Sequence, residues 1–312
     1  MPDELERWAA ARAPELVARA EAAAVEELKR SLLASVRGER PSAEPPPREP
    51  RRGTGIWAYG VMTAAAGLSE RIVGVDDRYE VERIEHRSLA ALVSRVPLDE
   101  FGEEPLRRNL NNFEWLERVA RAHEAVLEHA LANTTIVPLR LCTIFADEAG
   151  AKEMLDERHA TLTAALEGLA GHQEWSVKLL VGRDALIAAA EAAEPVEERA
   201  RPGGDGAAYL LNRREERRIG EAADRLAADL AADVHASLQD WTSDAVVRPP
   251  QNRELSGHDG DMLLNAAYLV ERGKVDRLRG LVAELAERHH ELGARLELSG
   301  PLPPYNFVPR PA

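Results

Sequence analysis

Apolar residues follow two spacings along this chain, and the change from one spacing to the other marks its elements. In residues 1–38 they recur every three or four positions, which is the period of one face of an α-helix. Residues 39–52 are rich in proline, which favours an extended, semi-rigid spacer. We therefore predict an amphipathic helical extension over residues 1–38 and a Pro-rich linker over residues 39–52.

The following part of the chain, residues 53–171, mixes strand and helix patterns. Its strand segments are rich in aromatic and β-branched side chains, which suit a pleated surface. Its helix segments place apolar residues along one face. The pattern predicts strands over residues 54–62, 79–86, 89–96 and 134–145 and helices over residues 111–131 and 154–169. We predict that this part forms an N-terminal α+β domain.

The second half of the chain has the order strand, helix, strand, strand, helix, strand. The predicted strands cover residues 175–181, 241–247, 262–270 and 294–298, and helical segments cover residues 185–238 and 275–292. This is the order of a ferredoxin-like βαββαβ fold, here with extra helices in the first crossover. We predict such a C-terminal domain over residues 172–299, and the whole chain is expected to be an α+β protein of two domains.

Composition and charge exclude several classes of partner. The chain has 312 residues, of which 45% are apolar and 30% charged, and no apolar run approaches the roughly 18 residues that a membrane span requires. Its net charge of -14 opposes binding to nucleic acid and to anionic lipid. The start of the chain has no secretory signal pattern, and its single cysteine cannot form an internal disulfide. We expect a cytoplasmic protein with no nucleic-acid partner and no membrane association.

No residue pattern predicts an active site. His123 and His129 are six positions apart, which places their rings on different faces of a helix and excludes the zinc-protease spacing. Cys142 lies in an apolar segment, where a lone cysteine is usually a small buried hydrophobe. The glycines of residues 203–206 lack the Lys-Ser or Lys-Thr of a phosphate loop, and residues 259–261 lack the later acidic ligands of a calcium loop. We predict no catalytic residue, no metal site and no cofactor.

Two surface features are candidates for protein contacts. Residues 213–218 alternate pairs of Arg and Glu, which at helical spacing normally form a solvated, ion-paired face. Residues 300–312 form a Pro-rich tail that carries Tyr305 and Phe307 on an extended path. Such a tail must dock, because it presents aromatic side chains. We predict that it docks between the two domains, with docking on a partner as the alternative.

Short segments spread along the chain carry a family resemblance. They are Trp57-Ala58-Tyr59-Gly60-Val61, Ala122-His123-Glu124, Val137-Pro138-Leu139-Arg140, Glu174-Trp175-Ser176-Val177-Lys178, Gly206-Ala207-Ala208-Tyr209-Leu210 with Arg213, Leu264-Asn265-Ala266-Ala267-Tyr268-Leu269-Val270, and the tail from Gly300 to Phe307. Together and in this order they resemble the gas vesicle accessory family GvpF/GvpL over roughly residues 54–308. The family usually has Arg-Phe-Gly-Thr where this chain has Arg140-Leu141-Cys142-Thr143.

The resemblance implies an accessory or minor protein of gas vesicle formation that binds the small hydrophobic shell protein GvpA and other Gvp proteins. It also implies two α+β domains, the second a modified ferredoxin fold, and a location on the gas vesicle, including its gas-facing surface, as well as in the cytoplasm. The residues that it marks as partner-binding or interdomain are Pro138, Leu139, Arg140, Tyr209, Arg213, Pro303, Pro304, Tyr305 and Phe307. It implies no catalysis.

Two other functions stay open at this point. A ferredoxin-like architecture hosts many unrelated activities, so a ligand-binding or enzymatic protein of unknown substrate is the alternative. RNA binding on the face of the sheet would require exposed aromatic side chains and a basic surface. The acidic balance of the chain argues against RNA.

Overall fold

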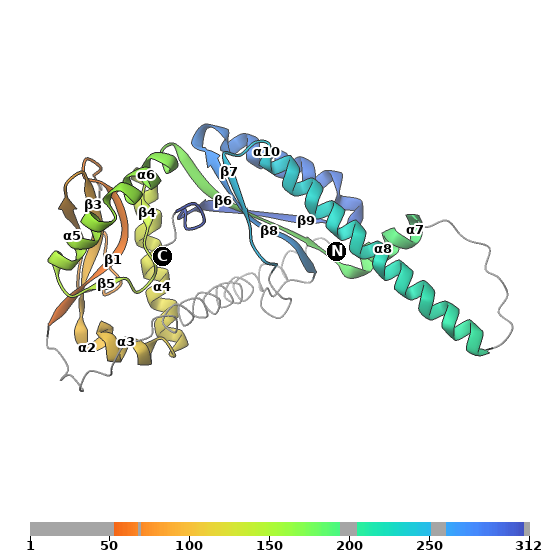
Figure 1. The fold of residues 1–312 in the computed structure, drawn as a ribbon, viewed down its shortest axis with the longest axis horizontal. Helices are drawn as coiled ribbons and strands as arrows, with labels where there is room; N and C mark the ends of the chain where they lie inside the picture. Colours follow the sequence, from red (N-terminus) through yellow and green to blue (C-terminus); the bar gives the residue numbers. More distant parts are fainter. Residues whose placement is uncertain (1–52, 68–69, 194–204, 251–259, 309–312) are drawn as a thin grey trace, which may run out of the picture. The chain divides into compact units, whose positions relative to one another are not determined.

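The computed structural model describes residues 53–67, 70–193, 205–250 and 260–308. The helix predicted over residues 1–38 and the linker over residues 39–52 lie outside the described residues. The chain divides into two compact units, one that ends at Gln173 and takes up the chain again from Leu302, and one that spans Glu174–Pro301. Each unit combines helices with a β-sheet (Figure 1), so the predicted α+β class is confirmed.

The first unit is built around a sheet of five strands. These are β1 (Thr54–Thr63), β2 (Val81–His86), β3 (Leu89–Pro97), β4 (Val137–Pro138) and β5 (Ile144–Phe145). The order is β2-β3-β1-β4, with β5 also paired to β1, and the pairs are antiparallel. Every position of β1 from Gly55 to Met62 is buried. Because successive side chains of a strand point to opposite faces, both faces of β1 must be covered.

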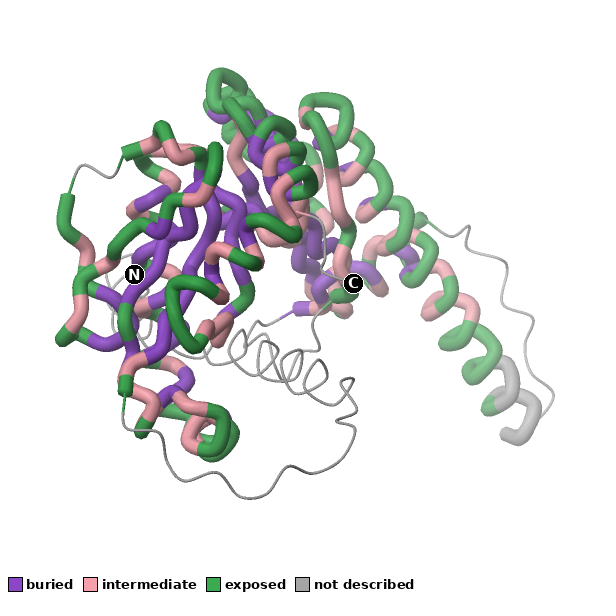
Figure 2. Tube along the Cα trace, turned by 60° about the vertical axis from the view of Figure 1, so that its left-hand side comes forward, coloured by how far each residue is buried: buried purple, intermediate pink, exposed green. Residues whose placement is uncertain are grey.

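Helices provide that cover. The described helices of the first unit are α2 (Leu98–Phe101), α3 (Glu103–Asn109), α4 (Phe113–Asn133), α5 (Glu148–Glu157) and α6 (His159–Leu169). Residues of α4 share a core with Trp57 and Tyr59 of β1. Helix α6 also contacts β1, and α5 contacts β2 and β3. Figure 2 shows the resulting pattern, with buried strands and helices that are exposed on their outer sides.

The strand predicted over residues 134–145 is wrong as a continuous element. Only β4 and β5 pair with β1, and the chain turns between them. Thr143 closes this turn, because its amide and its hydroxyl both donate to the carbonyl of Arg140. Cys142 has a φ of 65°, in the left-handed region that disfavours side chains with a Cβ. The apolar composition of the segment gave no sign of this backbone turn.

The second unit contains a four-stranded sheet of order β7-β8-β6-β9. Its elements are β6 (His172–Val181), α7 (Arg183–Ala193), α8 (Asp205–Gln239), β7 (Asp244–Val247), β8 (Asp261–Glu271), the 3-10 turn η1 (Arg272–Lys274), α10 (Val275–Arg288), the 3-10 turn η2 (His290–Leu292) and β9 (Arg295–Leu302). Over the described residues this is the predicted order of strands and helices, with α7 and α8 in the first crossover. Its description as ferredoxin-like stays a prediction.

The core of the second unit lies between the sheet and its helices. Alternate residues of β6, from Trp175 to Val181, pack with residues of α8, α10 and β8. Gly300, at φ 150°, lies against the ring of Trp175, where a Cβ would come within 2.8 Å of the ring atoms. Only glycine fits this position without a shift of its neighbours. Two of the segments that carry the resemblance therefore meet here.

The left-handed turn at Cys142 gives a first prediction. Cys142→Gly should be more stable than Cys142→Ala by about 1 kcal/mol, because both variants remove the sulfur but only glycine relieves the strain at positive φ. The measurement is the free energy of unfolding from denaturant titration of both variants. Equal stability of the two variants would show that the turn does not strain the chain.

Candidate functional site

Segments that carry the resemblance meet in the first unit around the buried ring of His123. Trp57 Nε1 donates a hydrogen bond to His123 Nδ1 over 3.1 Å, and the Tyr59 ring stacks on the imidazole at a centroid distance of 5.3 Å. Because Nδ1 accepts, the ring proton is on Nε2. Burial lowers the pKa of His123 to about 4, so the ring is neutral at physiological pH. Its place on the buried face of α4 makes it a packing residue.

The imidazole is not fully satisfied. His123 Nε2 has no hydrogen-bond partner among the described residues. It faces the carbonyl of Leu139, which raises the pKa of the ring slightly against the larger effect of burial. A buried donor without a full hydrogen bond costs stability. His123 therefore joins β1 to α4 through the hydrogen bond from Trp57, while its Nε2 has no hydrogen-bond partner among the described residues.

The hydroxyl of Tyr59 fixes the loop that precedes β2. It accepts a hydrogen bond from the amide of Val75 at 2.8 Å and shares one with Ser94 Oγ at 2.8 Å. Burial raises the pKa of Tyr59 to about 12, so the hydroxyl stays protonated. At Gly74 a Cβ would come within 2.5 Å of Ser94 Oγ, so the chain can approach Tyr59 this closely only with glycine.

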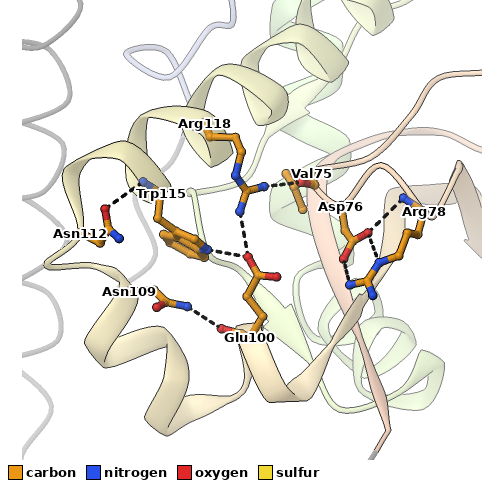
Figure 3. A network of polar contacts seen from close by, with 8 residues as sticks. All are labelled: Val75, Asp76, Arg78, Glu100, Asn109, Asn112, Trp115 and Arg118. Atoms are coloured by element: carbon orange, nitrogen blue, oxygen red, sulfur yellow. Dashed lines mark hydrogen bonds and ion pairs between the residues drawn. The ribbon is translucent and has the colours of Figure 1, made fainter.

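The same loop forms one wall of a surface pocket of about 480 Å³. The pocket is lined by Gly74, Val75, Asp76, Asp77, Arg78, Glu100, Arg118 and Ala122. Figure 3 shows the polar contacts around it, which involve the loop, α2 and α4. The pocket thus adjoins the Tyr59 hydroxyl through Val75.

The charges at the pocket are largely paired with one another. Glu100 Oε1 accepts from Trp115 Nε1 at 2.7 Å and from Arg118 Nη2 at 2.8 Å, and Arg118 also donates to the carbonyl of Val75 (Figure 3). Asp76 accepts from the Arg78 guanidinium at 2.6 and 2.9 Å, and this contact lowers the pKa of the Asp76 carboxyl. These contacts fasten α2, α4 and the loop together.

The site offers few reactive groups. Within the described ranges of the chain, no group of three or more His, Cys, Asp or Glu could hold a metal ion. Burial raises the pKa of Cys142 to about 12, so its thiol stays protonated at physiological pH and is a poor nucleophile. None of the described helices is long and apolar enough to cross a bilayer.

The C-terminal tail anchors on the first unit. Pro303 and Pro304 are buried, and Tyr305 and Phe307 are half-buried. Tyr305 packs against the core that contains Trp57 and donates a hydrogen bond from its hydroxyl to Glu124 Oε1 over 3.1 Å. Burial raises the pKa of the Glu124 carboxyl to about 7, against the smaller opposing effect of the Tyr305 hydrogen bond. Docking of the tail between the two domains stays a prediction.

The residues predicted to contact partners or the other domain are divided between the two units. Those of the first unit are Pro138, Leu139, Arg140, Pro303, Pro304, Tyr305 and Phe307, of which the three prolines and Leu139 are buried and Arg140 is exposed. Tyr209 and Arg213 are exposed on α8 of the second unit. Their partner-binding role stays a prediction. The pocket residues Asp76, Arg78, Glu100 and Arg118 were not predicted, because each is an ordinary charged residue in sequence.

The fold and this site define a two-unit α+β protein in which polar and aromatic contacts join separate elements. The family model described as gas vesicle synthesis protein GvpL/GvpF matches residues 55–309, and the chain belongs to this family. The family resemblance seen in the sequence is thus confirmed, and membership places the chain among the proteins of gas vesicle formation.

Individual relatives agree with this assignment. Gas vesicle protein L of Streptomyces sp. (strain CB03234) is 36% identical over 225 residues, which are 72% of this chain and 82% of that protein. Gas vesicle protein F of the same organism is 30% identical over 258 residues, or 81% of this chain and 98% of that protein. The crystal structure of the gas vesicle protein GvpF from Anabaena sp. PCC7120 matches with a TM-score of 0.62 at 19% identity, covering 83% of this chain and 98% of that chain. The structural match shows a shared fold.

Two substitutions of Tyr305 separate its hydrogen bond from its packing. Tyr305→Phe should lower the free energy of unfolding by about 1 kcal/mol, because the hydrogen bond to Glu124 is lost while the ring stays in place. Tyr305→Ala should lower it by about 3 kcal/mol, because the packed ring is lost as well. Denaturant titration measures both. Unchanged stability of both variants would mean that the tail is not anchored through Tyr305.

The raised pKa of Glu124 predicts a pH dependence. The carboxyl titrates near 4.5 in the unfolded chain and near 7 in the folded one, so the folded state binds more protons between these values. The stability contributed by this group is therefore fully present below pH 4.5 and is lost as the pH rises through 7. Glu124→Gln should remove this loss, because glutamine does not titrate. The free energy of unfolding of the variant minus that of wild type should therefore be larger at pH 8 than at pH 4.5, by roughly 2 kcal/mol.

Unfolding titrations of wild type and variant at both pH values give the test. His123, whose pKa is lowered, makes stability fall as the pH falls from 6.5 towards 4, and this effect cancels in the comparison because both chains contain it. Glu153→Gln, an exposed change of the same kind in α5, is the control and should show no such difference. Identical pH profiles for wild type and Glu124→Gln would contradict the prediction.

Proposed function

We propose that this protein assists the assembly or nucleation of gas vesicles by binding the hydrophobic shell protein GvpA and other gas vesicle proteins, and that it does so without catalysis. The shell subunits are strongly apolar and would otherwise aggregate, so a bound accessory protein keeps them competent for assembly. In this proposal the protein acts on the vesicle, including its gas-facing surface, and in the cytoplasm.

The observation that carries the proposal is the structural use of the motif residues. Trp57, His123 and Tyr305 belong to segments that carry the family resemblance, yet Trp57 and His123 contact each other in the core and Tyr305 packs against the core cluster that contains Trp57. Such residues specify a scaffold, whereas catalytic residues converge on a cleft with polar groups free to act. The pKa values of Cys142 and Tyr59 are raised by burial, which keeps both groups protonated. These features favour binding over chemistry.

Exposed apolar side chains supply contact surface for such binding. Among the described residues, the large hydrophobic side chains that remain exposed are Val73, Phe113, Tyr209, Trp241 and Val247. They lie on separate elements of both units, so shell subunits have several apolar contact points. Burial of apolar area on association provides the driving force.

The test is co-purification of the tagged protein with untagged shell protein. The full chain should retain soluble shell protein, and a chain that begins at Gly53 serves as the matched comparison. Retention by both chains places the contact in the two units, and retention by the full chain alone places it in residues 1–52. The proposal is wrong if neither chain retains the shell protein or keeps it in the supernatant after centrifugation.

A further inference from the structure

Helix α8 is much longer than the core that it covers. It spans 35 residues, and among its described side chains those that pack with the core of the second unit run from Ile219 to Leu238. Before that point, Tyr209 and all side chains of residues 212–217 are exposed. Figure 1 shows this half of α8 extending past the four-stranded sheet. Packing against the core therefore does not explain the side chains of Tyr209 and of residues 212–217.

Three of the exposed side chains form one stripe. Tyr209, Arg213 and Arg217 are spaced four residues apart, so they lie above one another on a single face of α8. Tyr209 is 61% exposed, the largest exposure among the large hydrophobic residues described. The stripe thus presents one aromatic ring followed by two guanidinium groups.

The guanidinium groups of this stripe form no ion pair within the described part of the chain. Arg218 pairs with Glu215 at 2.8 Å, but Arg213, Arg214 and Arg217 take part in none of the ion pairs formed there. Of the ion-paired face predicted for residues 213–218, the described residues thus show the pair of Glu215 and Arg218.

Helix energetics disfavour this arrangement. Arg213 and Arg217 are one turn apart, and like charges at this spacing destabilise a helix. Arg214 and Arg218 repeat the same spacing. The stripe is also a local exception in a chain whose net charge is -14. Since core packing does not account for these exposed side chains and no ion pair of Arg213 or Arg217 is formed among the described residues, the arrangement fits a surface that meets an external anion.

The chemistry of the stripe identifies the kind of partner. A guanidinium group binds a carboxylate through two parallel hydrogen bonds, and two of them one turn apart match acidic side chains at a similar spacing. An exposed tyrosine beside them adds apolar contact with a polar tip, and tyrosine and arginine are the residue types that dominate binding energy at protein interfaces. The best fit is a protein segment that carries carboxylates next to an apolar residue.

We propose that Tyr209, Arg213 and Arg217 form a docking stripe on α8 for an acidic segment of the shell protein. This inference rests on the proposed function and adds the contact surface and its chemistry. The two arginines pair with carboxylates of the shell protein, and Tyr209 packs against a neighbouring apolar side chain. Binding through this stripe weakens as salt screens the charges.

The experiment compares two double variants with wild type in the co-purification with shell protein, at low and at high salt. Arg213→Glu with Arg217→Glu reverses the stripe. Arg108→Glu with Arg225→Glu is the matched control, because both residues are exposed, neither forms an ion pair among the described residues, and the change in net charge is the same. Circular dichroism and a thermal melt show that both variants fold.

The stripe variant should bind the shell protein at least about tenfold more weakly than wild type, and the control should bind as wild type does. High salt should weaken the binding of wild type and of the control variant to the shell protein, but it should change the binding of the stripe variant little. Tyr209→Ala should give a smaller loss that salt does not alter, because the lost contact is apolar.

Three results would contradict the proposal that the stripe binds the shell protein. Equal binding by both double variants places the shell contact elsewhere and leaves the proposed function intact. No binding by wild type at any salt overturns the proposed function as well. Light scattering could instead show that wild type self-associates and that the stripe variant does not, which would make a second copy of this chain the occupant.

Discussion

The hydrogen bond from Trp57 to His123 joins β1, the central strand of the first unit, to helix α4, and the contacts around the pocket loop build on it. It fixes the orientation and the tautomer of the imidazole, so that the Tyr59 ring can stack on it. The hydroxyl of Tyr59 then reaches Ser94 and the amide of Val75, which positions the pocket loop. A charged imidazole would lose the lone pair that Trp57 uses. Burial in this core keeps the ring neutral, so the hydrogen bond and the packing around it maintain each other.

Hydrophobic patterns that continue over many residues were sufficient to predict most of the described elements of the fold. The strand at β1, the helix at α4 and the amphipathic α10 were predicted near their observed bounds, because each has a continuous period over many residues. The segment of residues 134–145 failed because one left-handed residue, Cys142, turns the backbone without any change in hydrophobicity. The helix predicted over residues 154–169 is likewise broken at Arg158, where the backbone leaves helical geometry.

The candidate site could be predicted only in part. The family resemblance marked the segments of Trp57, His123 and Tyr305, but their spacing in sequence gives no sign that they meet in one core. The ion pair between Glu100 and Arg118 joins residues 18 positions apart, and tertiary packing alone creates it. On α8, charges that are close in sequence were predicted to pair, but among the described residues Arg213, Arg214 and Arg217 form no ion pair. Exposed pairs gain little energy and must order two long side chains.

The anchoring of Tyr305 on Glu124 has a consequence for synthesis of the chain. The first unit is discontinuous, since residues from Leu302 complete a core whose other parts end at Gln173. On the ribosome, the second unit emerges in full before the segment that finishes the first, and domains tend to fold as they emerge. The unit that is translated first is therefore the last to be closed. Until Tyr305 leaves the exit tunnel, its binding surface on the first unit stays open to chaperones and to other nascent chains.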